Sequence, residues 1–381
     1  MPSDLKGKII QSSLPVLIPL GAVALALVIG AIMLLALGAD PIKAYQALFE
    51  GAFGNTNAFA DTLVRATPLL LVGVGICISF RGGVFNIGGE GQFIIGAIGA
   101  AALALYIEGL PGWVIIILSL TLGALGGAVW GGIPGALKAS LNVNEILSTI
   151  MMNAIAVQIM NFLLSGPLID PAQIEKGTFL PETARLPNIT DLPRLIPTRL
   201  HLGAAIAVLL AILVWILLWR TTVGYRIRAV GLNPFASRYA GIPVNRYAML
   251  ALTFSGALAG LAGAVQVLGV HHRLLTDGSA AGFTNGVGFD GIVAALFGGL
   301  HPLGTIPASV LFGGLLVGAN KLQRVVQVPS SLAVALNGLV VIFVVSSQIW
   351  RYYLSQKLAA AQAAEASQPE VKTPEIRERT S

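Results

Sequence analysis

Residues 80–92 read Phe80-Arg-Gly-Gly-Val-Phe-Asn-Ile-Gly-Gly-Glu-Gly-Gln92, and they separate two apolar stretches near 62–80 and 92–107. Five glycines and four polar side chains in this segment end one helix before another begins. In a membrane, backbone freed in this way is tolerated only where it is buried in protein or lines a wet cavity. A tight cytoplasmic turn between two spans is the alternative. In both cases the segment predicts a break between two membrane helices.

The rest of the chain has the composition of a membrane protein. Hydrophobic residues make up 55% of the 381 residues and charged residues 10%, whereas soluble domains contain about 25% charged residues. A bilayer core of about 30 Å requires around 20 apolar residues per helix, which predicts an all-α membrane protein with about ten transmembrane helices. The expected spans are 14–37, 62–80, 92–107, 112–134, 146–165, 201–219, 247–270, 287–300, 304–320 and 330–350.

A second break is expected at 285–292, where Asn285-Gly-Val-Gly-Phe-Asp-Gly-Ile292 precedes another short apolar run. Phe289-Asp290 aligns with Phe85-Asn86, and the two breaks open the third and the eighth span. Spans an odd number of helices apart run in opposite directions. The pattern therefore predicts an inverted repeat of spans 2–5 and 7–10 with broken helices at matching positions, chance similarity being the alternative.

Glycine recurs every four residues along the fourth expected span, at Gly123, Gly127, Gly131 and Gly135. Small residues at this spacing let the backbone of a neighbouring helix approach closely. The stripe indicates tight packing within a helix bundle and carries no information about a substrate.

Lysine and arginine are distributed unevenly between the two sides of the membrane. With both termini in the cytoplasm, fourteen of these residues lie on the cytoplasmic side and nine on the other, as the positive-inside rule requires. Six prolines indicate a long outer loop at 166–200, and 220–246 becomes a cytoplasmic loop. Residues 1–354 then form one transmembrane domain, and the polar residues 355–381 a disordered cytoplasmic tail.

The loop 220–246 contains five arginines and no acidic residue. Within it, Asn233-Pro234 provides a helix N-cap followed by proline at the first helical position, and Gly241 can adopt the left-handed conformation that ends a helix. We expect a helix of one or two turns that exposes Phe235 and Tyr239 for docking to another protein. An interfacial helix lying on anionic lipid is the alternative.

Polar residues in and beside the breaks are the candidate substrate contacts. A charged group at the bilayer centre costs about 2.5–3.5 kcal/mol, so we expect Glu90 to lie at a helix start, to pair with Arg81 or to face an aqueous path. For Asn153, within a span, burial by hydrogen bonding to another helix is the alternative. The candidate pathway residues are Asn86, Glu90, Gln92, Asn144, Glu145, Asn153 and Asp290.

Several chemistries are excluded by missing motifs. Gly7-Lys8 continues with isoleucine, so no phosphate-binding loop of the G-x-x-x-x-G-K-[ST] type is present. The histidines, His201, His271, His272 and His301, lie in loops or at helix ends without metal-ligand spacing. Basic residues lie between apolar runs instead of forming a stripe, which argues against nucleic-acid binding. We expect no catalytic residue and no metal site.

Four stretches carry a resemblance to a known family: Gly83-Val-Phe-Asn-Ile-Gly-Gly-Glu-Gly-Gln92, Val143-Asn-Glu-Ile-Leu-Ser-Thr-Ile-Met-Met-Asn153, Arg228-Ala-Val-Gly-Leu-Asn-Pro-Phe-Ala-Ser-Arg-Tyr-Ala-Gly-Ile242 and Gly286-Val-Gly-Phe-Asp-Gly-Ile292. Over roughly 60–350 the chain resembles the permease subunits of ATP-binding-cassette importers in the branched-chain amino acid, ribose and nucleoside group. The first two stretches are most similar to the nucleoside branch, whose receptor is a membrane-anchored lipoprotein.

The resemblance implies a multisubunit importer in a bacterial cytoplasmic (inner) membrane. Its partners would be a second homologous permease, a cytoplasmic ATPase with two nucleotide-binding halves, the external lipoprotein and membrane lipid. ATP would be used by the ATPase, so the permease itself needs no cofactor. The resemblance matches the loop 220–246 to the segment that docks on that ATPase. The candidate docking residues are Arg228, Asn233, Pro234, Phe235, Arg238, Tyr239 and Gly241.

The leading functional hypothesis is ATP-driven uptake of nucleosides by alternating access. A permease for simple sugars or branched-chain amino acids in the same type of complex is the first alternative. An ion-driven secondary transporter would need ion-binding groups deep in several spans, and these are sparse here. A scaffold without transport would not need paired broken helices.

Overall fold

The structure is a computed structural model that describes residues 21 and 23–327, apart from 176, 179 and 280, and a few single positions between 335 and 346. Contacts divide the chain into two units, one of Gly30–Gly338 and the other of Met1–Ile29 together with Leu339–Ser381. Every helix from α2 onward lies in the first unit.

Seven helices in the described residues are long and apolar enough to cross a membrane. They are α3 (Thr56–Arg81), α4 (Gly89–Tyr106), α5 (Gly112–Leu141), α6 (Glu145–Leu164), α8 (Gly203–Arg220), α11 (Val244–Gln266) with its π-helical extension η2 (Val267–His271), and α14 (Pro302–Val326). Two shorter apolar helices cover Val23–Ala36 and α13 (Val287–Phe297). The prediction of an all-α membrane protein is confirmed. The tenth expected span, 330–350, lies almost entirely outside the described residues, so the count of ten stays a prediction.

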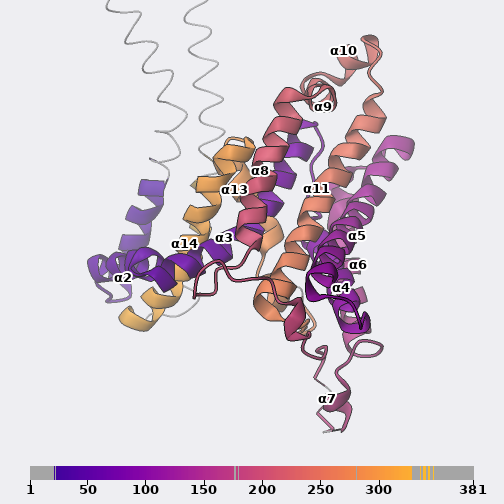
Figure 1. Cartoon of the computed structure of the whole chain (residues 1–381). Helices are drawn as coiled ribbons and strands as arrows, with labels where there is room; N and C mark the ends of the chain where they lie inside the picture. The colour runs from indigo at the N-terminus through magenta and orange to yellow at the C-terminus, as the bar shows by residue number, and fades with distance from the viewer. Residues whose placement is uncertain are drawn as a thin grey trace, which may run out of the picture. The chain divides into compact units, whose positions relative to one another are not determined.

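The centre of the unit is α3, which packs against α8, α11, α13 and α14 (Figure 1). Every residue from Ala66 to Ser79 on this helix is buried. By contrast, few residues of α5 and α6 are buried. In a bilayer such surfaces contact lipid or another membrane protein, because water is excluded from the hydrocarbon core.

Glycine allows α5 and α11 to pack backbone against backbone. A Cβ added at Gly131 would lie 2.7 Å from the carbonyl oxygen of Leu252, and one added at Gly256 would lie 3.0 Å from the Cα of Gly131. All four glycines of the expected stripe are buried in α5. The prediction that this stripe packs closely against another helix is confirmed.

The described residues of the segment 166–200 form no helix long enough to cross a membrane, as its prolines predicted. It contains the short helices α7 (Pro171–Glu175) and η1 (Asn188–Thr190). Backbone hydrogen bonds join it to the residues that follow η2, from Leu186 N to His272 O (2.8 Å) and from Thr183 N to Leu274 O (2.9 Å). In Figure 1 it lies at the end of the bundle opposite α10 (Pro234–Tyr239).

Helix α2 (Pro41–Phe53) was not expected from the sequence. It begins with Pro41 after Asp40, whose side chain accepts a hydrogen bond from Ile42 N (2.9 Å). Its small residues, among them Ala44 and Ala47, are buried, and the helix packs against α14. At 13 residues it is too short to span a bilayer.

Candidate functional site

The two predicted breaks meet inside the bundle. α4 begins at Gly89 after the turn 82–88, and α13 begins at Val287 after the short helix α12 (Ala281–Thr284). A Cβ added at Gly89 would lie 3.3 Å from the Cα of Gly288 and 3.4 Å from the side chain of Val72. Because Val72 lies in the buried part of α3, both helices start within the protein rather than at its surface.

From this meeting point α4 and α13 run in opposite directions. α4 ends at Tyr106, whose hydroxyl donates to the carbonyl of Pro167 in the segment 166–200 (3.3 Å). α13 ends near Leu300, whose carbonyl accepts from Arg81 Nε (3.0 Å) at the end of α3. The opposite directions agree with the predicted inverted repeat. The repeat as a whole stays a prediction because its last span lies outside the described residues.

Glu90 lies where the two helix starts meet and is 4% exposed. It belongs to the first turn of α4, and its Oε1 accepts a hydrogen bond from the amide of Gly288 in α13 (2.9 Å). Both helix N-termini carry partial positive charge, which stabilises a carboxylate between them. Of the three expected settings, the helix start is confirmed. Pairing with Arg81 is wrong, since Arg81 donates to the carbonyls of Gly299 and Leu300.

A buried polar network holds the turn before α4. Asn86 Nδ2 donates to Gln92 Oε1 (2.9 Å) and to Ser255 Oγ of α11 (2.8 Å), and Asn86 Oδ1 accepts from Gly88 N (2.9 Å). From α6, Asn153 accepts from Gly91 N (2.8 Å) and donates to Ile87 O (2.9 Å). Asn153 is thus hydrogen-bonded between helices, the alternative considered for it. Whether any of these residues contacts a substrate stays a prediction.

Of the three remaining pathway candidates, two lie apart from this network. Asn144 caps α6 by accepting from Ile146 N (2.9 Å), and Glu145 forms an ion pair with Lys138 (3.1 Å). Asp290 is in the first turn of α13 and is partly exposed. The structure therefore brings together Asn86, Glu90, Gln92, Asn153 and Asp290 around the two helix starts, and leaves Asn144 and Glu145 at the start of α6.

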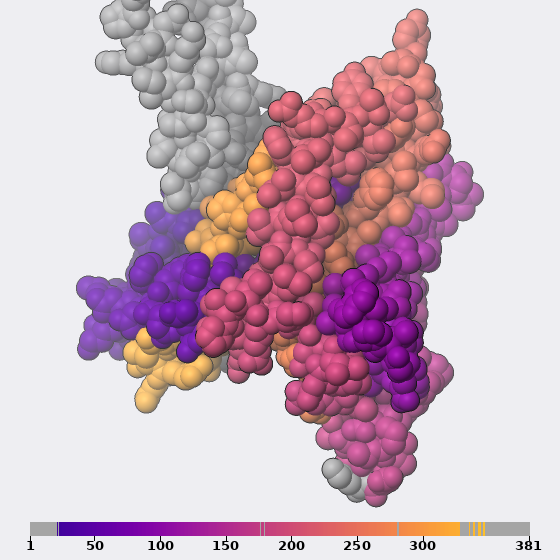
Figure 2. All heavy atoms as spheres, in the orientation of Figure 1, coloured from indigo at the N-terminus to yellow at the C-terminus, as the bar shows by residue number. Residues whose placement is uncertain are grey.

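The loop 220–246 forms the helix that its sequence predicted. After α9 (Thr222–Leu232), Asn233 accepts a hydrogen bond from Ala236 N (3.0 Å) and caps α10, with Pro234 at its first position. Gly241 follows with a φ of 77°, the left-handed conformation. Phe235 is 82% exposed and Tyr239 is 98% exposed. The space-filling view shows the segment from α8 to α10 ending in a projection (Figure 2).

The base of this loop is fixed to the bundle. Arg228 donates to Leu218 O (2.9 Å), and both Arg228 and Arg81 lie over the ring of Trp219, 5.4 and 5.5 Å from its centroid. Gly83, with a φ of 73°, packs against Gly231 of α9, and a Cβ added at Gly83 would lie 2.9 Å from the Gly231 Cα. The loop thus contacts the turn that leads into α4. Arg228 anchors the loop, whereas Phe235 and Tyr239 point outward.

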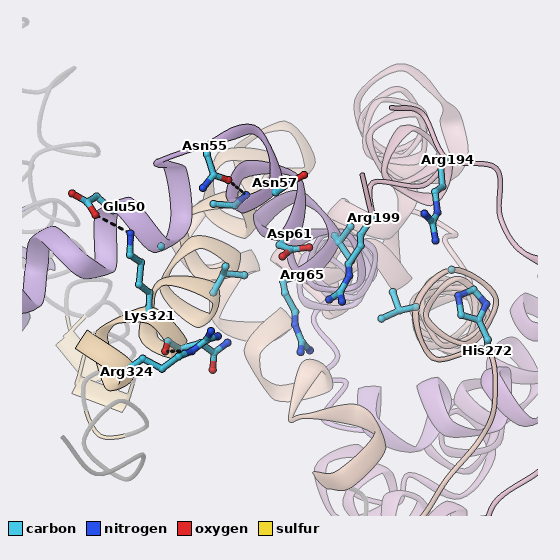
Figure 3. Close-up of a pocket in the computed structure, with 17 residues that line it drawn as sticks. Glu50, Asn55, Asn57, Asp61, Arg65, Arg194, Arg199, His272, Lys321 and Arg324 are labelled. Atoms are coloured by element: carbon cyan, nitrogen blue, oxygen red, sulfur yellow. Dashed lines mark hydrogen bonds and ion pairs between the residues drawn. The ribbon is translucent and has the colours of Figure 1, made fainter. Parts of the chain in front are cut away.

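A cavity at the opposite end of the bundle was missed by the sequence reasoning. It has a volume of about 780 Å³ and is lined by residues of α2, α3, α14, η2 and the segment 166–200. We call it the basic cavity, because its lining includes Arg65, Arg194, Arg199, Lys321 and Arg324 (Figure 3). These arginines and this lysine are far apart in the sequence, so no local motif marked them. Among the described residues, no group of three His, Cys, Asp or Glu side chains could hold a metal ion.

Comparison with known proteins decides the family. The family described as "Branched-chain amino acid transport system / permease component" matches residues 58–345. The chain belongs to this family of permeases. The permease is 38% identical to the guanosine ABC transporter permease protein NupP of Bacillus subtilis, over 89% of this chain and 96% of the relative. It is 32% identical to the nucleoside ABC transporter permease protein NupB of Lactococcus lactis, over 92% and 96%.

The permease is also 30% identical to the glucose ABC transporter permease protein TsgB13 of Haloferax volcanii, over 88% of each chain. Bacillus subtilis and Lactococcus lactis each have a second permease similar to this chain, NupQ and NupC. The similarity to NupP and NupB covers almost the full length of both relatives, including the two breaks and the loop 220–246.

Proposed function

We propose that the permease is a subunit of an ATP-driven importer that moves nucleosides across the bacterial cytoplasmic membrane by alternating access, with both termini in the cytoplasm. The observation that carries this proposal is the 38% identity to the guanosine permease NupP over 89% of the chain. The similarity to NupB supports the same substrate class. A sugar is less favoured, since the glucose permease TsgB13 is similar at only 30% identity.

In this proposal the chain itself is not an enzyme, and ATP is hydrolysed by a cytoplasmic ATPase with two nucleotide-binding halves. The exposed side chains of Phe235 and Tyr239 on α10 support a docking role for the loop 220–246. A helix with two aromatic side chains exposed to this degree offers the kind of anchor that protein interfaces use. Arg238, in the last turn of α10, adds positive charge to the same projection.

The permease would pair with a second, homologous permease and receive substrate from an external lipoprotein. The similar pairs NupP with NupQ and NupB with NupC, each from one organism, support a heteromeric complex. The exposed apolar lengths of α5 and α6 are compatible with contact to lipid and to a second membrane protein.

The substrate path would follow the broken helices α4 and α13. Their starts carry the polar groups Asn86, Glu90, Gln92 and Asp290 within otherwise apolar spans. In membrane transporters, broken helices at corresponding positions of two repeats line the substrate site. ATP binding would move the docking loops, and the two permeases would then open the path alternately to the two sides.

Uptake by the reconstituted complex tests the proposal. The permease, its partner permease, the ATPase and the lipoprotein would be placed in proteoliposomes and given radiolabelled guanosine, ribose and leucine in parallel. We expect ATP-dependent uptake of guanosine that ribose and leucine do not compete. Uptake of ribose or leucine instead would change the proposed substrate to a sugar or an amino acid but retain the proposed importer complex. Uptake without ATP would overturn the assignment as an ATP-driven importer.

A further inference from the structure

The basic cavity has more positively charged side chains in its lining than acidic side chains to neutralise them. Lys321 forms an ion pair with Glu50 (2.8 Å), and Arg324 Nε donates to the carbonyl of Asn320 (3.3 Å). Arg65, Arg194 and Arg199 form no ion pair with any residue in the described part of the chain.

Figure 3 shows that Arg65 of α3 and Arg194 and Arg199 of the segment 166–200 approach the basic cavity from one side. Lys321 and Arg324 of α14 lie on another side of it. Acidic residues in the lining are Glu50, already paired with Lys321, and Asp61. Three guanidinium groups that face one cavity without an ion pair favour a ligand with negatively charged oxygens, since arginine binds carboxylate and phosphate through paired N–H groups.

The surroundings of the basic cavity have the properties of a membrane–water boundary. It lies at the end of the spanning helices α3 and α14, and α2 borders it through Glu50 and Gly51. α2 buries its small residues against α14, while Phe49 and Phe53 are 64% and 38% exposed. A short helix with one buried and one exposed aromatic face is typical of helices that lie in the membrane interface.

Next to the basic cavity, three exposed phenylalanines form a continuous apolar surface. The ring centroids of Phe49 and Phe53 are 5.4 Å apart, and those of Phe53 and Phe59 are 6.3 Å apart. Phe59 follows Ala58, which lines the basic cavity. A ligand that fills the basic cavity with an anionic group can therefore extend an apolar part over this phenylalanine surface.

We propose that the basic cavity binds the phosphate headgroup of an anionic phospholipid, whose acyl chains lie along Phe49, Phe53 and Phe59. The volume of about 780 Å³ suits a headgroup-sized ligand, and a concave site suits it better than the broad face of an acidic protein. Phosphate oxygens accept charge-assisted, often bidentate hydrogen bonds from arginine. The same phosphate chemistry could come from a free phosphate, which has no acyl chain to contact the phenylalanines.

Native mass spectrometry of the full-length chain in detergent tests this site. Phosphatidylglycerol, phosphatidylcholine and inorganic phosphate are the probes, and Arg65→Gln/Arg199→Gln is compared with Arg185→Gln. Arg185 is an exposed arginine of the same 166–200 segment that does not line the basic cavity. We expect phosphatidylglycerol to bind more tightly than phosphatidylcholine, and each cavity substitution to weaken it about fivefold. Arg185→Gln should leave the affinity unchanged.

Two further measurements separate the possible outcomes. Phe49→Ser should weaken the binding of phosphatidylglycerol and leave the binding of inorganic phosphate unchanged. If inorganic phosphate bound as tightly as the lipid, the ligand would be a free anion and the lipid site would be overturned. Equal binding of the two lipids would overturn it as well. If Arg65→Gln/Arg199→Gln still bound phosphatidylglycerol but no longer bound an acidic binding protein, the lipid site would also be overturned. If the double variant fails to fold, the affinity of the unmodified chain for phosphatidylglycerol is measured at rising salt concentration. Binding of the headgroup by arginine must weaken steeply as salt rises, so an affinity that does not change would overturn the site.

Discussion

The amide of Gly288 donates a hydrogen bond of 2.9 Å to the carboxylate of Glu90, across 198 residues of sequence. This bond joins the starts of α4 and α13, which run in opposite directions from it. A carboxylate at this position is stabilised by both helix N-termini, and it fills the place where two freed backbone segments meet. The bond therefore links the two halves of the proposed substrate path.

Replacing Glu90 with alanine should destabilise the junction. The amide of Gly288 would lose its acceptor inside the protein, and a buried donor left without a partner costs about 1–3 kcal/mol in free energy of unfolding. Glu90→Gln keeps one acceptor oxygen and should cost less. Unfolding of the purified chain by titration with denaturing detergent measures both effects.

The matched control is Glu50→Gln in α2. Its carboxylate pairs with Lys321 at a largely exposed site, and such pairs contribute about 0–1 kcal/mol. An equal loss of stability for Glu90→Ala and Glu50→Gln would show that the α4–α13 junction does not depend on the Glu90 carboxylate.

Substitution of Gly131 by alanine should also destabilise the bundle. The added methyl group would lie 2.7 Å from the carbonyl oxygen of Leu252, and overpacking of this kind costs about 1–3 kcal/mol. On the same helix, a methyl group at Gly126 would lie 3.5 Å from Ile95, an ordinary contact. Gly126→Ala should therefore be neutral or slightly stabilising. Thermal unfolding compares the two variants. Equal decreases in melting temperature for Gly131→Ala and Gly126→Ala would contradict this account.

The proposed docking role of α10 can be tested without disturbing the bundle. Arg238→Glu/Tyr239→Ala should leave the chain folded and abolish the coupling of ATP hydrolysis to uptake in the reconstituted complex, because Tyr239 is 98% exposed. Tyr225→Ala, at a residue of α9 that is 61% exposed, serves as the control. Full transport by the double variant would exclude α10 as the contact with the ATPase.

Stability should fall as the pH falls below 6.5. Burial, and then the charge of His272, lower the pKa of His201 from 6.5 to about 4, so the folded chain holds this imidazole neutral. A histidine with a lowered folded pKa contributes stability that is fully present above the unfolded pKa and is lost between pH 6.5 and 4. The loss attributable to His201 is about 2 kcal/mol by pH 5.

His201→Asn removes this titration while keeping a side-chain oxygen that can accept the hydrogen bond from Gly203 N, which His201 Nδ1 accepts at 3.2 Å. Melting temperatures at pH 7 and pH 5 should therefore differ less for the variant than for the unmodified chain. An unchanged difference would assign the pH dependence to other groups.

The breaks and the short helix α10 could be predicted from the sequence because each depends on local composition. Glycine density ends a helix wherever it occurs, and the Asn233-Pro234 cap needs no partner outside its own turn. The bond from Gly288 to Glu90 could not be predicted, because it depends on which two of many helix starts meet. α2 was missed since its 13 residues fall below the length that marks a span.

The basic cavity illustrates the same limit. Arg65, Arg199 and Lys321 come from three segments whose neighbours in sequence are unremarkable in charge. Only the packing of α3, α14 and the segment 166–200 brings them to one space. Local patterns therefore predicted the interior breaks and the projecting helix, while sites assembled from distant segments required the fold.

The contact between Gly83 and Gly231 limits how far the loop 220–246 can move on its own. Neither residue has a side chain that could rotate or compress between the two backbones. A displacement of α9 must therefore either separate the two backbone segments or move the turn 82–88 with it. That turn ends at Gly88, two residues before Glu90, so a movement of the proposed ATPase-docking loop would be passed directly to the junction of the broken helices.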